Sequence, residues 1–290
     1  MHPAPSLIVF TTLSGLGFGL LAFLGLGQPP VAGWVLATFF AMGFGLAGAG
    51  LIASTFHLGH PERALLAFTQ WRTSWLSREA VLAVATFAVL GPYAALAVFL
   101  DLRLGWLGAL GSALALATVF ATAMIYAQLK TVPRWNHWST PALFLAYALA
   151  GGALLSSKTA WAEWLLLGLL ILQLWAFVDG DRRFQRSGQT LAKATALPGP
   201  IRSFAPPHTG TNYLLKEMVH QVGRKHSQRL RVLGLTFGLA LPAFGLLLFD
   251  VGHLGAGLLV INHVAGVFAL RWLFYAEAEH VVGLYYGAHG

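Results

Sequence analysis

Long apolar stretches recur along the whole chain, and they constrain its fold more than any other feature of the sequence. A run of roughly 17–25 apolar residues can cross the hydrocarbon core of a bilayer as a helix. Only 10% of the 290 residues are charged, too few to cover the surface of a soluble globule. The sequence predicts an all-α integral membrane protein, a bundle of about eight transmembrane helices over residues 6–26, 31–56, 80–100, 105–128, 141–156, 160–178, 232–249 and 254–273.

The composition also excludes several kinds of site. The chain has no cysteine, so it cannot supply thiolates to an iron–sulfur cluster or form a disulfide. It carries no P-loop, zincin helix or Gly-x-Ser-x-Gly elbow, and we expect no soluble enzyme domain and no nucleic-acid partner. Its start lacks the basic region of a secretory signal, so we expect the first apolar span to be retained.

Lysine and arginine are distributed unevenly between the two ends of the predicted helices. With eight spans both termini lie on one side, and sixteen of the eighteen basic residues fall on that side. Arg103 and Lys158 fall on the other side. By the positive-inside rule, both termini are predicted to be cytoplasmic. The protein is then a multi-pass protein of the bacterial inner membrane.

Residues 1–290 are predicted to form a single membrane-anchor domain, with a long basic cytoplasmic loop at 179–231 between helices six and seven. The first part of this loop is polar and punctuated by Gly and Pro, which predicts irregular structure. Residues 212–231 are predicted to form a helix that leads into the seventh span. The loop can bind anionic lipid headgroups or a soluble partner, and the two alternatives are compatible.

The segment 57–79 gathers titratable and aromatic side chains where the second span ends and the third begins. His57 ends one apolar span and Glu79 begins another. An ionisable side chain at membrane depth indicates a functional site, although such groups at helix ends often only extend to the headgroups. Imidazole and carboxyl groups exchange protons and bind carbonyl oxygens, and aromatic walls suit an apolar ring. This is the chemistry that a quinone headgroup needs.

The same segment also fits a loop that is merely anchored at the membrane surface. Pro61 can begin a helical turn with Glu62 near its N-terminus, so residues 62–70 are predicted to form a short interfacial helix. Trp71 and Trp75 are typical of the headgroup level. This alternative explains the tryptophans and arginines better than it explains the two titratable residues at the ends.

A tyrosine and three histidines in or near the spans are candidates for quinone binding and haem ligation. The phenol of Tyr126 is placed to reach a quinone oxygen, although an aromatic-belt role fits Tyr126 alone better. His253, His263 and His280 raise the question of haem ligation. A bis-histidine haem needs facing imidazoles at matched depth, and His263 has no clear mate. We therefore expect no haem, and a histidine that binds a neighbouring carbonyl is the commoner arrangement.

Three local features predict details of packing. The four glycines between positions 43 and 50 favour close approach of the second span to a neighbour. Pro242 is expected to kink the seventh span unless neighbours stabilise it. Glu277 and His280 fall at helix-neighbour spacing, which predicts a pair within one helix.

Two stretches of the sequence resemble the membrane-anchor subunits of dimethyl sulfoxide reductase-type enzymes. One is HLG-x-P-x-R-A at 57–64 followed by Ser77-x-Glu79, and the other is TVP-x-W…W-x-TP at 131–141. The resemblance covers nearly the whole chain in length and number of spans. It implies an anchor without a cofactor of its own that binds a four-cluster iron–sulfur subunit, which contacts a molybdopterin catalytic subunit.

The resemblance also implies a quinone site, with ubiquinone or menaquinone as its ligand. It assigns quinone binding and proton transfer to His57 and Glu79, and less directly to Arg63 and Arg72. Together with two aromatic residues, the predicted set is His57, Glu79, Arg63, Arg72, Trp71 and Tyr126. Contacts around the ring are expected to differ from the reductase branch, because His60, Glu62 and Trp71 replace residues there.

The predicted cytoplasmic side is similar to that of the sulfite dehydrogenase branch of the same family. Residues 207–218 and 271–287 also resemble that branch. We therefore expect electrons to pass from cytoplasmic sulfite oxidation to quinone. The alternatives are a quinol-oxidising anchor of a dimethyl sulfoxide or S-oxide reductase, a secondary transporter, and a tether without a quinone site.

Overall fold

The computed structural model describes residues 1–56, 60–157, 159–199, 201–205, 207–219 and 226–287. No β-strand occurs in these ranges. The apolar helices are α1 (Pro5–Gly25), α2 (Gly33–Thr55), α3 (Trp75–Phe99), α4 (Gly105–Ala127), α5 (Ser139–Leu155), α6 (Thr159–Arg186), α8 (Ser227–Leu235), α9 (Leu241–Leu248) and α10 (His253–Ala276). A π-helical turn, η4 (Thr236–Ala240), joins α8 to α9.

The predicted all-α membrane fold is confirmed at the level of its helices. With α8 to α9 taken as one span, seven helices of the described residues are long and apolar enough to cross a membrane. The eighth predicted segment corresponds to α5, a shorter apolar helix of 17 residues. Each apolar stretch found in the sequence is therefore helical.

Two helix boundaries differ from the prediction because polar turns extend the apolar spans. Helix α3 begins at Trp75 rather than residue 80, since Ser74 caps it by accepting a hydrogen bond from the Ser77 N–H at 3.5 Å. Helix α6 continues to Arg186, past the predicted end at 178. An ion pair one turn apart, Asp179 with Arg183 at 2.6 Å, supports this extension.

Short elements complete the chain. They are η1 (Pro61–Phe68), α7 (Leu191–Thr195), the π-helical turn η2 (Leu214–Met218) and η5 (Val281–Tyr286). The short helix predicted over 62–70 is present as the 3₁₀ helix η1. Of the helix predicted over 212–231, the described part comprises η2 and the start of α8. Residues 220–225, between them, lie outside the described residues.

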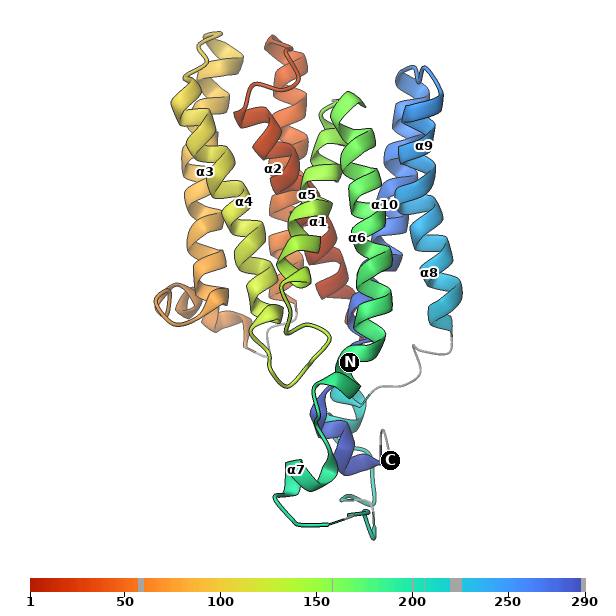
Figure 1. The fold of residues 1–290 in the computed structure, drawn as a ribbon. Helices are drawn as coiled ribbons and strands as arrows, with labels where there is room; N and C mark the ends of the chain where they lie inside the picture. Colours follow the sequence, from red (N-terminus) through yellow and green to blue (C-terminus); the bar gives the residue numbers. More distant parts are fainter. Residues whose placement is uncertain (57–59, 158, 200, 206, 220–225, 288–290) are drawn as a thin grey trace.

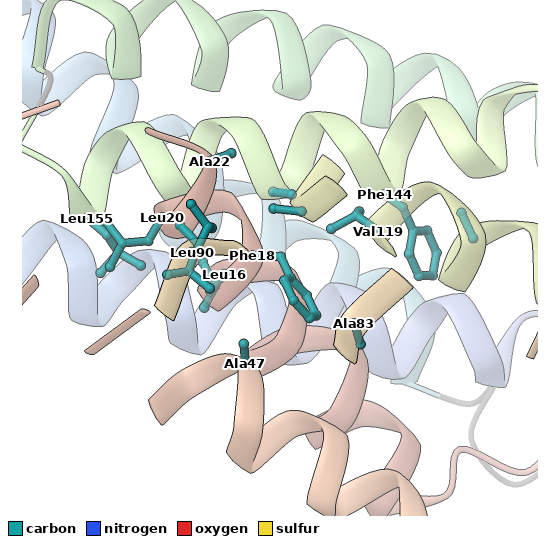
Figure 2. Close-up of a cluster of buried hydrophobic side chains, with 14 of the residues drawn as sticks. Leu16, Phe18, Leu20, Ala22, Ala47, Ala83, Leu90, Val119, Phe144 and Leu155 are labelled. Carbon is teal, nitrogen blue, oxygen red and sulfur yellow. The ribbon is translucent and has the colours of Figure 1, made fainter. Parts of the chain in front are cut away.

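The long helices stand side by side in a bundle, and both ends of the chain lie at the same end of it (Figure 1). The connections 60–74 and 128–138 lie at that end too, and α7 and η5 form a lobe that extends beyond it. Helix α1 is the most buried span and packs against α2, α4 and α5. Figure 2 shows the apolar core around it, which includes Leu16, Phe18, Leu20, Ala47, Leu90, Val119 and Phe144.

Small residues allow the helices of this core to approach closely, as membrane helices require. A Cβ atom added at Gly19 of α1 would overlap the backbone of Ala148 in α5. Of the four glycines predicted to pack in α2, Gly43 and Gly50 face α1, whereas the other two face open space. The prediction is thus correct for the half of the set that shares one helix face.

The proline in the second half of the bundle is accommodated by a neighbouring histidine. Pro242 has no N–H, so it cannot bind the carbonyl of Gly238 one turn earlier. Nδ1 of His263 in α10 lies 2.6 Å from that carbonyl oxygen and satisfies it. The irregularity predicted at Pro242 takes the form of the π-helical turn η4, and His263 makes the carbonyl contact expected of a single intramembrane histidine.

Candidate functional site

The polar segment before α3 folds back and is fastened to the first turns of that helix. Arg78 donates from Nε to the carbonyl oxygen of Trp71 at 3.0 Å and from a terminal nitrogen to that of Arg72 at 2.7 Å. Its guanidinium also lies 4.3 Å from the ring centroid of Trp75. These contacts occupy Arg78 and leave the next residue, Glu79, facing the interior of the bundle.

Glu79 is a buried carboxyl group without a counter-charge among the described residues. Its side chain is on α3, and the residue is 4% exposed. The hydroxyl of Thr122 in α4 donates to Oε1 of Glu79 and lies 3.0 Å from the carbonyl oxygen of Thr118. Burial without a cation makes the charged form of a carboxyl group costly. A group held in this way suits proton exchange with a ligand.

Glu79 lies in the wall of an apolar cavity of about 490 Å³. Side chains of α1, α2, η1, α3 and α4 form this cavity, among them Phe10, Leu51, Ala67, Phe68, Leu76, Ala83, Phe87 and Ile125. Ligand pockets usually have volumes of roughly 300–1,000 Å³ and apolar walls with few polar groups. Glu79 and Tyr126 are the titratable side chains among the described residues that line it.

Tyr126 is held in the cavity wall by a cage of aromatic rings. Its ring contacts those of Trp135, Phe144, Phe274 and Tyr275, with centroid distances between 5.3 and 5.8 Å. Its hydroxyl lies 2.8 Å from the hydroxyl of Tyr275 in α10. The hydroxyl is therefore buried and hydrogen-bonded, rather than placed at the headgroup level as an aromatic-belt residue would be.

The structure brings together two of the six predicted site residues. Glu79 and Tyr126 line the same cavity. Arg63, Trp71 and Arg72 are exposed on the outer side of the segment and do not line it, and Arg72 lies over the Trp71 ring at 5.6 Å. His57 lies outside the described residues. No group of three or more His, Asp or Glu side chains suited to a metal ion occurs in the described part of the chain.

Comparison with known proteins identifies a family to which the chain is similar. The family model for the DMSO reductase anchor subunit (DmsC) matches residues 1–173. The chain belongs to this family of anchor subunits. One subunit of the sulfite dehydrogenase of Allochromatium vinosum is 33% identical to it over 328 aligned positions, which cover 99% of each protein.

A second relative of the anchor is the anaerobic dimethyl sulfoxide reductase chain YnfH of Escherichia coli K12. It is 40% identical over 111 residues, which cover 37% of the anchor and 38% of that chain. No solved structure matches the anchor.

The segment 131–141 of the anchor, which carried part of the resemblance, packs against Tyr126 through Trp135. Trp135 is buried, donates from Nε1 to the carbonyl oxygen of Phe274 at 2.9 Å and stacks on the Phe274 ring at 5.2 Å. The N–H of Val281 donates to the carbonyl oxygen of Thr131 at 2.9 Å. This segment therefore ties the end of α4 to the end of α10.

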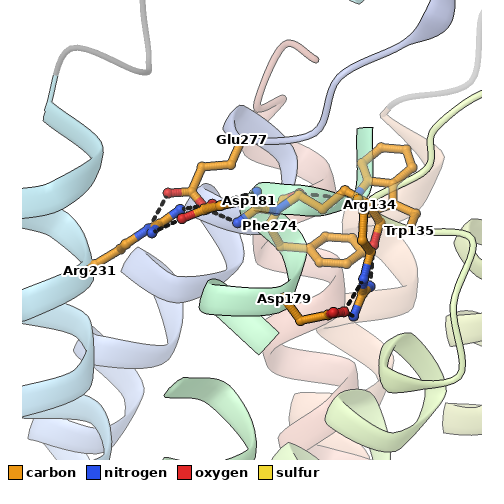
Figure 3. A network of polar contacts seen from close by, with 8 residues as sticks. Arg134, Trp135, Asp179, Asp181, Arg231, Phe274 and Glu277 are labelled. Atoms are coloured by element: carbon orange, nitrogen blue, oxygen red, sulfur yellow. Dashed lines mark hydrogen bonds and ion pairs between the residues drawn. The ribbon is translucent and has the colours of Figure 1, made fainter. Parts of the chain in front are cut away.

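A cluster of paired charges lies beside this segment, at the ends of α6, α8 and α10 (Figure 3). Glu277 accepts hydrogen bonds from Arg134 and Arg231, both at 2.6 Å. Asp181 bridges the same two arginines at 2.9 and 2.6 Å. The pair predicted within one helix between Glu277 and His280 is therefore wrong, because two arginines from other parts of the chain occupy the carboxylate.

His137 connects the loop before α5 to this charged region. Its Nδ1 accepts a hydrogen bond from the Ser139 N–H at 3.2 Å, and Arg183 donates to the Ser139 hydroxyl at 3.0 Å. Burial lowers the pKa of His137 and the nearby Arg183 lowers it further, while Asp179 opposes both. His137 is thus a neutral acceptor at neutral pH.

Sequence reasoning missed Thr122 and Tyr275 as members of the site. Thr122 lies one helical turn before Tyr126, so its place on the same face of α4 was available from spacing. Tyr275 is distant in sequence, and the packing of α10 against α1 and α5 brings its hydroxyl to Tyr126.

Proposed function

We propose that this anchor is the quinone-reactive subunit of a molybdenum and iron–sulfur oxidoreductase in the bacterial cytoplasmic membrane. The observation that carries the proposal is the apolar cavity with Glu79 in its wall. The cavity has the volume and the apolar lining that a quinone ring requires, and Glu79 and Tyr126 supply polar groups for its oxygens. A pure tether would have no need of a buried, unpaired carboxyl group.

Glu79 and Tyr126 have distinct roles in this proposal. Reduction of a quinone to a quinol consumes two electrons, supplied by the partner subunits, and two protons. Glu79 gives a proton to a ring oxygen when protonated and takes one back afterwards, and the Thr122 hydroxyl orients its carboxyl group. The Tyr126 hydroxyl hydrogen-bonds a ring oxygen. We carry His57 from the resemblance as a second proton-exchanging group.

The relatives support a proposal for the partners and for the direction of electron flow. The relative aligned over 99% of its length belongs to a sulfite dehydrogenase, so we propose transfer from sulfite to ubiquinone or menaquinone. The partners would be a four-cluster iron–sulfur subunit and a molybdopterin catalytic subunit. The shorter match to an anaerobic dimethyl sulfoxide reductase chain supports quinol oxidation as the alternative direction.

The arrangement of basic residues supports a cytoplasmic position for these partners. The connections 60–74 and 128–138 lie at the end of the bundle that holds both termini, and the connection between α3 and α4 lies at the opposite end (Figure 1). The first two contain Arg63, Arg72, Lys130 and Arg134, and the last contains Arg103. By the positive-inside rule the first end faces the cytoplasm. We propose that all eight helices of the single domain 1–290 span the membrane and that the basic loop within 179–231 is cytoplasmic.

The test is a comparison of two acceptors in the purified complex. Glu79→Gln is expected to lower quinone reduction by sulfite by about 100-fold, because the proton donor is lost. Sulfite oxidation with a soluble artificial acceptor should remain unchanged, since the catalytic subunit is intact. Glu163→Gln is the matched control, because Glu163 lies in the first turns of α6 at the opposite end of the bundle.

Unchanged quinone reduction in Glu79→Gln would contradict the site assignment. A loss of both activities would indicate that Glu79 is needed for assembly instead. Labelling of the complex by a photoreactive quinone provides an independent measure of binding, and the label should attach to residues of α2, η1 or α3.

A further inference from the structure

A second cavity lies next to the apolar one and opens toward the end of the bundle that holds the termini. Its volume is about 470 Å³. It shares Leu7, Ile125 and Tyr126 with the apolar cavity, and its own lining includes His2, Leu129, Trp135, Tyr213, Glu217, Met218 and Tyr275. We call this second cavity the vestibule. It contains polar and titratable side chains, whereas the first cavity is almost entirely apolar.

The hydrogen-bonded pair of Tyr126 and Tyr275 joins the linings of the two cavities. Tyr126 lines both, Tyr275 lines only the vestibule, and Glu79 lines only the apolar cavity. The two hydroxyl oxygens are 2.8 Å apart and buried, and either can be the donor. On the other side, Thr122 holds Glu79 one helical turn from Tyr126 on the same face of α4. Glu79, Tyr126 and Tyr275 are thus arranged in series.

The lining of the vestibule also contains two neighbouring titratable side chains, His2 and Glu217. Nδ1 of His2 lies 3.9 Å from the Glu217 carboxylate, and both side chains are about two-fifths exposed, at 39% and 41%. The N–H of His2 also donates to the carbonyl oxygen of Glu217 at 2.7 Å, which holds the two residues together. An imidazole ring has one nitrogen that can donate a proton and one that can accept it.

We propose that the Tyr126–Tyr275 hydroxyl pair carries protons between the vestibule and Glu79. This inference rests on the proposed quinone function. Tyr275 accepts a proton that His2 supplies through vestibule water, while its own proton passes to the Tyr126 oxygen. Tyr126 at the same time releases its proton to the Glu79 carboxylate through water in the cavity. Both tyrosines end neutral, and Glu79 regains the proton that it gave to the quinone. Electrons reach the quinone separately, from the iron–sulfur partner.

Such a pair could instead serve only to satisfy two buried hydroxyl groups. The two roles differ in what the loss of one hydroxyl changes. Removal of a packing contact alters assembly or quinone affinity, whereas removal of a relay slows proton delivery at unchanged affinity.

The experiment compares Tyr275→Phe with Tyr147→Phe in the purified complex. Both changes remove one buried hydroxyl, and Tyr147 donates to Gln173 at 2.8 Å and lines neither cavity. We expect Tyr275→Phe to lower kcat for quinone reduction by about tenfold with KM unchanged, and to raise the solvent deuterium isotope effect on kcat. Tyr147→Phe should leave kcat, KM and the isotope effect at wild-type values.

A double variant at the opening, His2→Ala with Glu217→Gln, provides a test that leaves the interior of the bundle intact. We expect a twofold to fivefold fall in kcat that added imidazole restores, because a small base in water can replace the lost groups. This variant decides the matter if Tyr275→Phe does not assemble. A kcat that stays unchanged, or that imidazole does not restore, would then overturn the relay.

The outcomes also separate this inference from the proposed function. If Glu79→Gln abolishes quinone reduction while Tyr275→Phe has wild-type kcat and isotope effect, the relay is wrong and the quinone site stands. If Glu79→Gln itself has no effect, the proposed function fails and the relay fails with it. A Tyr275→Phe complex that changes KM alone would make the pair a packing contact and overturn the relay.

Discussion

Two buried glutamates near the same end of the bundle have opposite surroundings. Glu79 is 4% exposed and Glu277 is 7% exposed. Glu277 binds two arginines, each at 2.6 Å, and Asp181 completes a four-membered network with them. Glu79 receives a hydroxyl from Thr122 and no cation from the described residues. The two glutamates are therefore about equally buried, but only Glu277 has cationic partners among the described residues.

This difference supports the proposal that Glu79 exchanges protons, whereas Glu277 holds the structure together. A carboxylate bound by two arginines is committed to that ion-pair network. It joins the end of α10 to the start of α8 and to the loop before α5. A carboxyl group with one hydroxyl donor at the wall of an apolar cavity has no such constraint, and it can exchange a proton with a ligand.

The largest expected effect that would separate the two glutamates is the loss of stability in Glu277→Gln. Removal of one partner from a buried ion-pair network leaves charges uncompensated, which costs about 3 kcal/mol. The free energy of unfolding, measured by titration with a denaturing detergent, should fall by that amount. Quinone turnover per assembled complex should remain near the wild-type value.

Glu79→Gln is the matched comparison and should give the reverse result. Its unfolding free energy should change by less than about 1 kcal/mol, since no ion pair is lost. If Glu277→Gln retained full stability, or if it lost quinone turnover in the assembled complex, the division of roles between the two glutamates would be wrong.

Much of the fold could be predicted from the sequence because the bilayer imposes one requirement on every span. Apolar length alone located the eight apolar helices that the described residues form when α8 to α9 is taken as one. It failed at the ends, where helices α3 and α6 extend into polar turns. There the structure depends on a serine cap and on the Asp179–Arg183 pair, which a hydropathy argument does not detect.

Residues of the candidate site could be predicted only where the local sequence around them is unusual. Glu79 stood out because a carboxyl group is unusual at the start of an apolar helix. Tyr126 gained its significance from Tyr275, 149 residues away, and this contact has no local signal. The charged network was misread for the same reason, since spacing suggested His280 for Glu277 while the actual partners are Arg134 and Arg231.

A smaller effect, on quinone turnover through Glu79, is expected for Thr122→Val. The change keeps the shape of the side chain and removes the hydroxyl that donates to Glu79. A carboxyl group without its orienting donor should transfer protons less efficiently, and quinone turnover should fall by about fivefold, equivalent to about 1 kcal/mol. Thr122→Ser is the control, because it retains the hydroxyl and should restore most of the rate. Equal rates for the Val and Ser variants would show that the hydroxyl does not orient Glu79.

The smallest expected effect tests whether the burial of an ion pair determines how much it contributes to the free energy of unfolding. Asp181 contacts the same two arginines as Glu277, but its side chain is 44% exposed against 6% for Glu277. Water and salt screen a half-exposed pair, so Asp181→Asn should lower the free energy of unfolding by about 0.5 kcal/mol. The difference from wild type should also shrink when the ionic strength is raised, which is not expected for Glu277→Gln. Equal destabilisation of Asp181→Asn and Glu277→Gln at all salt concentrations would show that the number of ion pairs, and not their burial, governs stability. The difference between Glu79 and Glu277 would then depend only on the presence of arginine partners.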